Sequence, residues 1–252
     1  MFIKFDSFCY YYKVGKEYIK ALDNVNLSIV DKDFLCIVGE SGSGKSTILR
    51  SMLGQCEYVD GSLCIDDIPI ENIDIKRINC SYLTQNEMLF PNLTVYENIA
   101  FPLRVARVSY EETERRVVEI AKCCDINWLL TRKPKQLSAG QARCVALCRA
   151  LVKKPALLLL DEPFSSLDEL WKIKLRQYLK QIYDEWGLTV VMSTHDISEA
   201  FALATRIAVF QDGRVVESGS PDALDKNHKS QLLNTFFEEQ SLLQNQTSGE
   251  YK

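Results

Sequence analysis

A glycine-rich stretch at residues 39–47, GESGSGKST, has the composition of a loop that binds the phosphates of a nucleotide. Glycines let backbone N–H groups converge on phosphate oxygens at a helix N-terminus. We expect Lys45 to add a positive charge for the outer phosphates of ATP and Ser46 to offer its hydroxyl to Mg²⁺. The pattern is complete, so a chance glycine-rich loop is disfavoured. The remaining residues expected to bind nucleotide here are Gly39, Glu40, Ser41, Gly42, Ser43, Gly44 and Thr47.

An acidic pair, Asp161 and Glu162, follows the apolar run at residues 157–160. Carboxylates at the end of a buried strand can hold Mg²⁺ through water and can polarise an attacking water. We therefore assign Asp161 to Mg²⁺ and Glu162 to the general base. Such a pair alone could equally cap the following helix. Its presence beside a phosphate-binding loop favours the catalytic interpretation.

Three short, continuous apolar runs predict parallel strands that are covered on both faces. They span residues 34–38, 156–160 and 188–192, and helical stretches separate them. Because parallel strands need crossover helices, we expect an α/β core. The phosphate loop would join the first of these strands to a helix that starts near Lys45.

The other segments predict smaller parts around this core. Residues 25–29 and 61–65 alternate apolar and polar side chains, which indicates half-buried antiparallel strands. Residues 86–154 contain no strand-like apolar run and predict a helical lobe that interrupts the sheet. Residues 207–216 predict a β-hairpin that turns at Asp212-Gly213.

A second loop motif, LSAGQ at residues 137–141, leads into a predicted helix. It places Ser138 and Gly140 at a second helix N-terminus, which is an anion site that the phosphate loop itself does not need. Ser138 and Gln141 could instead form an ordinary capping box. Taken alone, the motif would favour the capping box.

In this order, from about residue 2 to residue 224, the motifs resemble those of ATP-binding subunits of ABC transporters, whose signature is LSGGQ. The resemblance implies a P-loop NTPase (RecA-like) core with an antiparallel β subdomain and an inserted α-helical subdomain. It implies one domain at 1–240, with the core and β subdomain at about 1–85 and 155–240 and the helical subdomain at about 86–154. A polar tail would occupy 241–252.

The resemblance also implies roles for residues that the sequence alone would leave unassigned. Tyr12 would stack on adenine, although Tyr10 and Tyr11 compete for that position. Gln85 would sense Mg²⁺ and link the site to the helical lobe, and His195 would contact the γ-phosphate and help position the attacking water. The residues implied to reach the ATP of a second subunit are Ser138, Ala139, Gly140, Gln141 and, in a loop that crosses the dimer interface, Asp168.

The chain departs from the family pattern at three positions. Ala139 replaces the usual signature glycine and adds a methyl group beside an incoming phosphate. Cys144 stands where an arginine is common, and Lys32 replaces a usual turn glycine. None of these changes removes a catalytic group.

Composition limits the classes of function. The formal net charge of -4 over 252 residues gives no basic field for nucleic acid. No run approaches the roughly 18 apolar residues of a membrane span. The nine cysteines are odd in number and scattered, so we expect reduced, mostly buried thiols and no disulfide. Cys123-Cys124 is not a CxxC motif, which disfavours a metal site formed by cysteines.

These features predict an ATPase that powers transport of a solute across a membrane, with import favoured. Exporters and lipoprotein-release systems remain alternatives, as does a non-transport iron–sulfur assembly ATPase. The resemblance implies membrane-spanning subunits as partners, a second copy or another ATP-binding subunit, and a solute-binding protein as a further candidate. It implies a location in the cytoplasm, on the inner face of the cell membrane.

Overall fold

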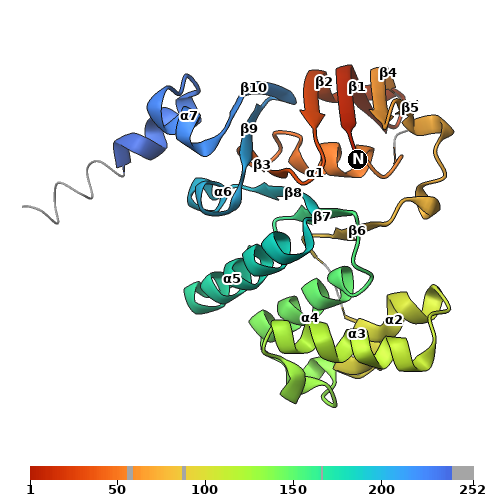
Figure 1. Cartoon of the computed structure of the whole chain (residues 1–252). Coiled ribbons are helices and arrows are strands. Elements are labelled where there is room, and N and C mark those ends of the chain that lie inside the picture. The colour runs from red at the N-terminus through yellow and green to blue at the C-terminus, as the bar shows by residue number, and fades with distance from the viewer. Residues whose placement is uncertain (56–58, 87–88, 166, 240–252) are drawn as a thin grey trace, which may run out of the picture.

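The computed structural model describes residues 1–55, 59–86, 89–165 and 167–239, so the expected tail at 241–252 lies outside the described residues. The described part has the predicted α/β architecture, with two sheets and a group of helices below them (Figure 1).

The mixed sheet has the strand order β10-β9-β3-β8-β7-β6 in the described residues. Its strands pair in parallel except for the antiparallel pair β9 and β10. The bounds are β3 (Phe34–Val38), β6 (Cys80–Leu83), β7 (Leu157–Asp161), β8 (Thr189–Thr194), β9 (Arg206–Gln211) and β10 (Arg214–Gly219). The three predicted parallel strands are confirmed as β3, β7 and β8.

The predicted hairpin is confirmed, because Asp212 and Gly213 join β9 to β10 with φ angles of 49° and 76°. Positive φ at both turn residues matches the twist of a two-residue hairpin. The sequence pattern does not predict β6. That strand is four residues long and lies at the sheet edge, and only Leu83 is fully buried, so it lacks the continuous apolar run of the central strands.

A second, antiparallel sheet has the order β2-β1-β4-β5. Its strands are β1 (Ile3–Val14), β2 (Glu17–Ile29), β4 (Val59–Ile65) and β5 (Ile68–Pro69). Helix α1 (Lys45–Ser51) packs against β2 on one side and against β7 and β8 on the other, so it lies between the sheets. The predicted alternation at residues 25–29 is confirmed, with Val25, Leu27 and Ile29 buried.

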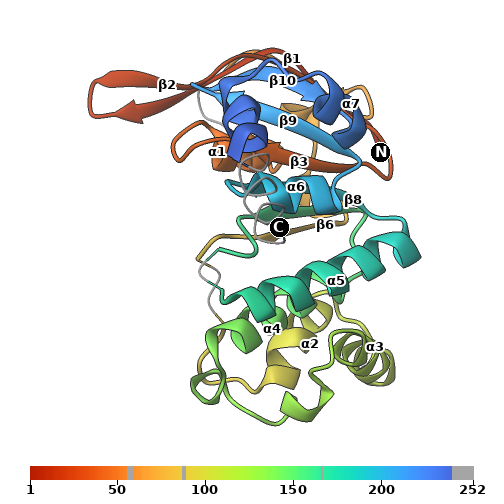
Figure 2. The ribbon, with the colours of Figure 1, turned by 90° about the vertical axis from the view of Figure 1, so that its left-hand side faces the viewer.

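The mixed sheet separates two apolar cores. In β3, Leu35 and Ile37 face the core shared with α1 and the antiparallel sheet, whereas Phe34, Cys36 and Val38 face the helical side. All five are fully buried, which explains why the sequence shows a continuous apolar run here. Figure 2 shows these layers in order, with α5 (Glu169–Trp186) and α6 (Ile197–Leu203) beneath the mixed sheet.

The helical lobe contains α2 (Val95–Val105), α3 (Tyr110–Cys123) and α4 (Ala139–Leu151), and no strand occurs among its described residues. α2 contacts both α3 and α4, and α4 also contacts β6. Shorter elements complete the fold: η1 (Ile70–Asn72), η2 (Ile75–Arg77), η3 (Asn127–Leu129), η4 (Pro134–Gln136), α7 (Pro221–Lys226) and a helical segment at 231–239.

The backbone at Lys32 explains why the family resemblance implies a glycine at this position. Its φ is 63°, in the left-handed region, which costs a side-chain-bearing residue about 1–2 kcal/mol relative to the right-handed region. The turn is held from outside. The Lys32 N–H donates to Thr189 Oγ1 at 3.0 Å, and the Tyr183 hydroxyl donates to the Lys32 carbonyl at 2.7 Å.

Candidate functional site

The parallel register of the mixed sheet brings the predicted chemistry to one edge. The phosphate loop follows β3, Gln85 lies just beyond β6, Glu162 follows β7, and His195 follows β8. Because these strands run in the same direction, their carboxyl ends meet at a single edge. A cavity of about 760 Å³ opens there. Its lining residues are Tyr12, Ile19, Lys20, Ala21, Ser41, Gly42, Gly44, Lys45, Ser46, Thr47, Gln85, Glu162 and His195.

The ammonium group of Lys45 is held by the phosphate loop itself. Its Nζ donates to the carbonyls of Gly39 and Glu40, each at 2.8 Å, and lies 3.9 Å from Glu162 Oε1. The side chain is only 5% exposed, and burial lowers the pKa of Lys45 despite the neighbouring carboxylates. A bound phosphate would give this charge a stronger acceptor than the two carbonyls.

The loop also shows two features that fit a phosphate ligand. Gly42 and Gly44 have φ angles of 83° and 103°, so the chain turns through conformations that favour glycine just before α1 begins. The hydroxyl of Ser43 is buried and has no hydrogen-bond partner within the described residues. A phosphate oxygen at the start of α1 would supply an acceptor for such a donor.

Asp161 is the most densely hydrogen-bonded carboxylate of the site. Its Oδ1 accepts from Ser46 Oγ at 2.9 Å and from Ser193 Oγ at 2.6 Å, and its Oδ2 accepts from the Tyr82 hydroxyl at 3.1 Å. Asp161 is 3% exposed. Burial, and then the charge of Asp161, raise the pKa of Tyr82 to about 12, so this hydroxyl remains a donor. Mg²⁺ prefers oxygen ligands such as the Asp161 carboxylate and the Ser46 hydroxyl.

Glu162 has a left-handed backbone, with φ of 45°. Its N–H donates to the carbonyl of Ser193 at 3.1 Å, which holds this conformation against its cost. Its Oε2 accepts from Gln85 Nε2 at 3.1 Å and lies 3.4 Å from His195 Nδ1. Together with Lys45, three predicted site residues therefore converge on Glu162, which is the arrangement expected around a general base.

Tyr12 lies at the mouth of the cavity, whereas its two competitors do not line it. Its hydroxyl lies 3.0 Å from Thr47 Oγ1, and the residue is 36% exposed. Tyr10 is buried at 7% exposure beneath the Tyr12 ring, and Tyr11 donates outward to Asp60. The placement favours Tyr12 as the aromatic residue that a base would reach.

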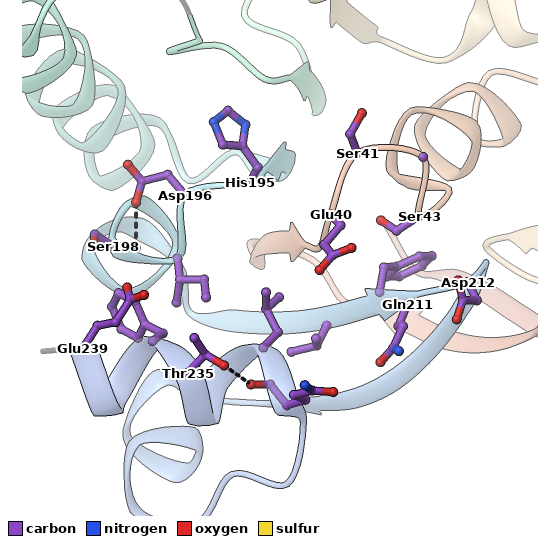
Figure 3. Close-up of a pocket in the computed structure, with 17 residues that line it drawn as sticks. Glu40, Ser41, Ser43, His195, Asp196, Ser198, Gln211, Asp212, Thr235 and Glu239 are labelled. Atoms are coloured by element: carbon purple, nitrogen blue, oxygen red, sulfur yellow. Dashed lines mark hydrogen bonds between the residues drawn. The ribbon is translucent and has the colours of Figure 1, made fainter.

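His195 lies between this cavity and a second one of about 750 Å³ on the other side of the phosphate loop. Figure 3 shows His195 across the pocket from the loop residues Glu40 and Ser41, with the helix that carries Thr235 and Glu239 along another side. The His195 side chain is 62% exposed. This open face leaves room for another polypeptide to approach the phosphate loop.

The signature residues lie outside the cavity lining, among the described residues, and have structural roles within their own chain. Ser138 caps α4 in a capping box with Gln141, and Asp168 caps α5 by accepting from the Trp171 N–H at 3.0 Å. A Cβ at Gly140 would lie 2.2 Å from the Trp171 ring, so glycine is required there. Ala139 is exposed.

Three contributors were absent from the sequence analysis: Tyr82, Ser193 and Arg143. The first two sit inside or beside strand runs and carry no motif of their own. Arg143 lies in the first turns of α4, directly before Cys144, the position where the family resemblance implies an arginine. This adjacent arginine is the only feature of the sequence that could have suggested its role.

Arg143 on α4 donates hydrogen bonds to the loops that follow β6 and β7. Its guanidinium donates to the carbonyls of Thr84, Pro163 and Glu162 at 2.9, 2.8 and 3.1 Å, with longer contacts to those of Gln85 and Asp161 at 3.3 and 3.4 Å. One side chain thereby joins the loop after β6 to the loop after β7. Those two loops present Gln85 and Glu162 to each other.

Comparison with known proteins identifies the class of protein. The ABC transporter family model matches residues 22–165. The chain is 39% identical to the glucose import ATP-binding protein GlcV of Saccharolobus solfataricus, covering 95% of this chain and 69% of the relative. It is 37% identical to the sn-glycerol-3-phosphate import ATP-binding protein UgpC of Brucella abortus, covering 87% and 62%. It therefore spans about two thirds of the length of these relatives.

Solved structures agree. The dimeric ATP-binding cassette MJ0796, in a post-hydrolysis state bound to ADP and phosphate, superposes with a TM-score of 0.78 at 36% identity, covering 87% of this chain and 98% of that one. The chain belongs to the ABC transporter family, as an ATP-binding cassette with the fold and the site of an ATPase. No described helix combines the length and the apolar character needed to cross a bilayer.

We predict that Arg143→Lys lowers kcat for ATP hydrolysis about tenfold and changes KM less than twofold. Lysine keeps the charge but cannot reach two loops at once, and a lost hydrogen bond to a charged group is worth about 1.5–3 kcal/mol. Steady-state kinetics of the purified protein measures both constants. Arg116→Lys on α3 is the matched control, since Arg116 pairs with Glu112 away from the site. An unchanged kcat, or a change confined to KM, would contradict this positioning role.

Proposed function

We propose that the chain is the ATP-hydrolysing subunit of an ABC importer and that it works in pairs on the inner face of a membrane. The observation that supports this most is the convergence of Lys45, Asp161, Glu162 and His195 on one edge of the sheet. The relatives carry import in their names, which favours import over export, lipoprotein release and iron–sulfur assembly.

Each side chain has a task that follows from its position. Lys45 exchanges the carbonyls of Gly39 and Glu40 for the outer phosphate oxygens of ATP. Glu162 accepts a proton from the attacking water, and Gln85 and His195, which both contact its Oε2, hold that water in line.

Mg²⁺ fits the oxygen donors Ser46 and Asp161, and when bound it neutralises charge that develops on the phosphates. Ser193 and Tyr82 keep the Asp161 carboxylate oriented toward Ser46. Gln85, which donates to Glu162, is the remaining candidate ligand. In this arrangement the same aspartate links the phosphate-loop helix to β6, β7 and β8.

A pair of chains is needed because the signature residues lie away from the chain's own cavity. The exposed N-terminus of α4 around Ser138 can attract an anion, and the nucleotide cavity of its own chain is not lined by it. In a twofold pair, the ATP held by one phosphate loop would face this helix end of the partner, with Asp168 beside it. The similar cassette MJ0796 has been solved as a dimer.

We predict that Glu162→Gln with MgATP forms a stable twofold dimer that carries two nucleotides, whereas the same protein with ADP is monomeric. ATP attracts both helix ends, and removing the base prevents its loss. Size-exclusion chromatography with light scattering gives the mass in each state.

Ala139→Arg in the Glu162→Gln background is the matched control. Ala139 is exposed, so an arginine there leaves the Ser138 cap in place and adds bulk only to the interface. The doubly substituted protein should bind MgATP and stay monomeric. If the Glu162→Gln variant is monomeric at tens of micromolar with saturating MgATP, self-pairing is wrong and a different ATP-binding subunit must be the partner.

We also propose where a membrane-spanning subunit docks. A groove of about 370 Å³ lies between β6 and the helical lobe, next to the strand that leads to Gln85. Phe90 and Phe101 line it, are 40% and 39% exposed, and contact each other with ring centroids 4.6 Å apart. Arg149 and Lys153 also line the groove. Arg149 is buried, at 8% exposure, whereas Lys153 is partly exposed. The exposed aromatic rings beside the Lys153 charge fit an amphipathic helical segment with acidic residues.

We predict that Phe101→Glu reduces copurification with the cognate membrane-spanning subunits at least tenfold. It should leave the ATP-dependent dimer of the Glu162→Gln background intact, because Phe101 is outside the nucleotide cavity. Tyr110→Glu, on an exposed aromatic residue of α3, is the control. Equal recovery of the membrane subunits with both variants would refute the groove as the docking surface. The transported solute is chosen by those partners, together with a solute-binding protein.

A further inference from the structure

Three buried cysteines meet in the helical lobe, away from the nucleotide cavity. Cys124 caps the C-terminus of α3, and Cys144 and Cys148 lie one helical turn apart on α4. Their Sγ atoms all lie within 4.8 Å of one another, and each residue is at most 1% exposed. Among the described residues, this is the one group of three or more candidate ligands at such distances.

The distances between the three sulfur atoms are close to those around a bound metal ion. A metal–sulfur bond is about 2.3 Å, so three sulfurs around one ion in a plane are separated by about 4.0 Å. The thiols need to move by less than about 1 Å to reach that geometry. At present their hydrogen bonds are weak, with Cys144 Sγ 3.8 Å from the Cys124 carbonyl and Cys148 Sγ 3.9 Å from the Ile120 carbonyl.

The ligand set selects the metal. Thiolates bind soft ions and discriminate against Mg²⁺ and Ca²⁺. Structural zinc sites almost always have four ligands, whereas the described group supplies three. A buried site of three sulfurs fits Cu⁺, which soft sulfur ligands favour.

We propose that Cys124, Cys144 and Cys148 form a trigonal site for Cu⁺ or a similar thiophilic monovalent ion. Each copper–sulfur bond replaces a sulfur–hydrogen bond and releases its proton to solvent, without a change in oxidation state. The bound ion would fasten the end of α3 to α4. Because Arg143 precedes Cys144 on α4 and reaches the catalytic loops, this ion would stiffen the helix that positions them.

The sequence pattern disfavours a metal site formed by cysteines, because Cys123-Cys124 is not a CxxC motif. The structure explains how three ligands escape that search. Two of them are four residues apart on one helix, which places both on the same face, and the third comes from the end of another helix 20 residues earlier in the chain. The site depends on α3 packing against α4, which no local pattern reports.

The test is a titration of the full, reduced chain with Cu⁺ under anaerobic conditions, against a chromophoric Cu⁺ chelator. We expect one tightly held equivalent per chain with thiolate-to-metal charge-transfer absorption. Cys144→Ala should weaken this binding at least tenfold. Cys123→Ala is the matched control, because Cys123 is adjacent in sequence but outside the group and only partly buried.

Cys124→Ala is a second variant, should Cys144→Ala fail to fold, and MgATP binding without copper checks that each variant is native. A wild-type chain that loses all Cu⁺ to the chelator would overturn the proposal. So would binding that persists equally in Cys144→Ala and Cys124→Ala, since the ion would then lie on other thiols. Preferential binding of Zn²⁺ in competition would overturn the three-coordinate assignment.

Discussion

The buried carboxylate of Asp161 is the interaction on which the rest of the site depends. A carboxylate that is 3% exposed is tolerated only when its oxygens are paired, and here Ser46, Tyr82 and Ser193 supply three hydroxyl donors. These donors come from α1, β6 and β8, while Asp161 ends β7. One charge therefore fixes the relative positions of the phosphate-loop helix and three parallel strands.

Glu162, the next residue, is positioned by the same strands. Glu162 turns away in a left-handed conformation, held by the backbone of Ser193, and so points its carboxylate at Lys45, Gln85 and His195. Arg143 then carries the same geometry into the helical lobe by binding carbonyls of both loops. Arg143 on α4 is thus joined by hydrogen bonds to the carbonyl of Glu162 and to the loop after β6.

Much of this could be predicted from sequence because it is local. A few consecutive residues are enough to predict the strand at 34–38, the loop at 39–47 and the turn at Asp212-Gly213. What the sequence could not provide depends on contacts between distant segments. β6 is an edge strand without an apolar run. The role of Arg143 depends on two loops that meet only in the folded chain. The three cysteines come together only when α3 packs on α4. The capping box at Ser138 and the Asp168 cap give these two motif residues structural roles within their own chain. Such a role does not exclude a contact with a partner chain.

We propose that Asp161 anchors Mg²⁺ and that the phosphate loop binds ATP even without the metal. The most direct measurement is the ATP affinity of wild type and Asp161→Asn by calorimetry, each with Mg²⁺ and with a chelator. Asparagine keeps an oxygen for the neighbouring hydroxyls but loses the charge. We predict that wild type binds ATP more tightly with Mg²⁺, and that Asp161→Asn keeps its metal-free affinity through Lys45 but loses the gain from Mg²⁺. An equal Mg²⁺-dependent gain in both proteins would contradict the account.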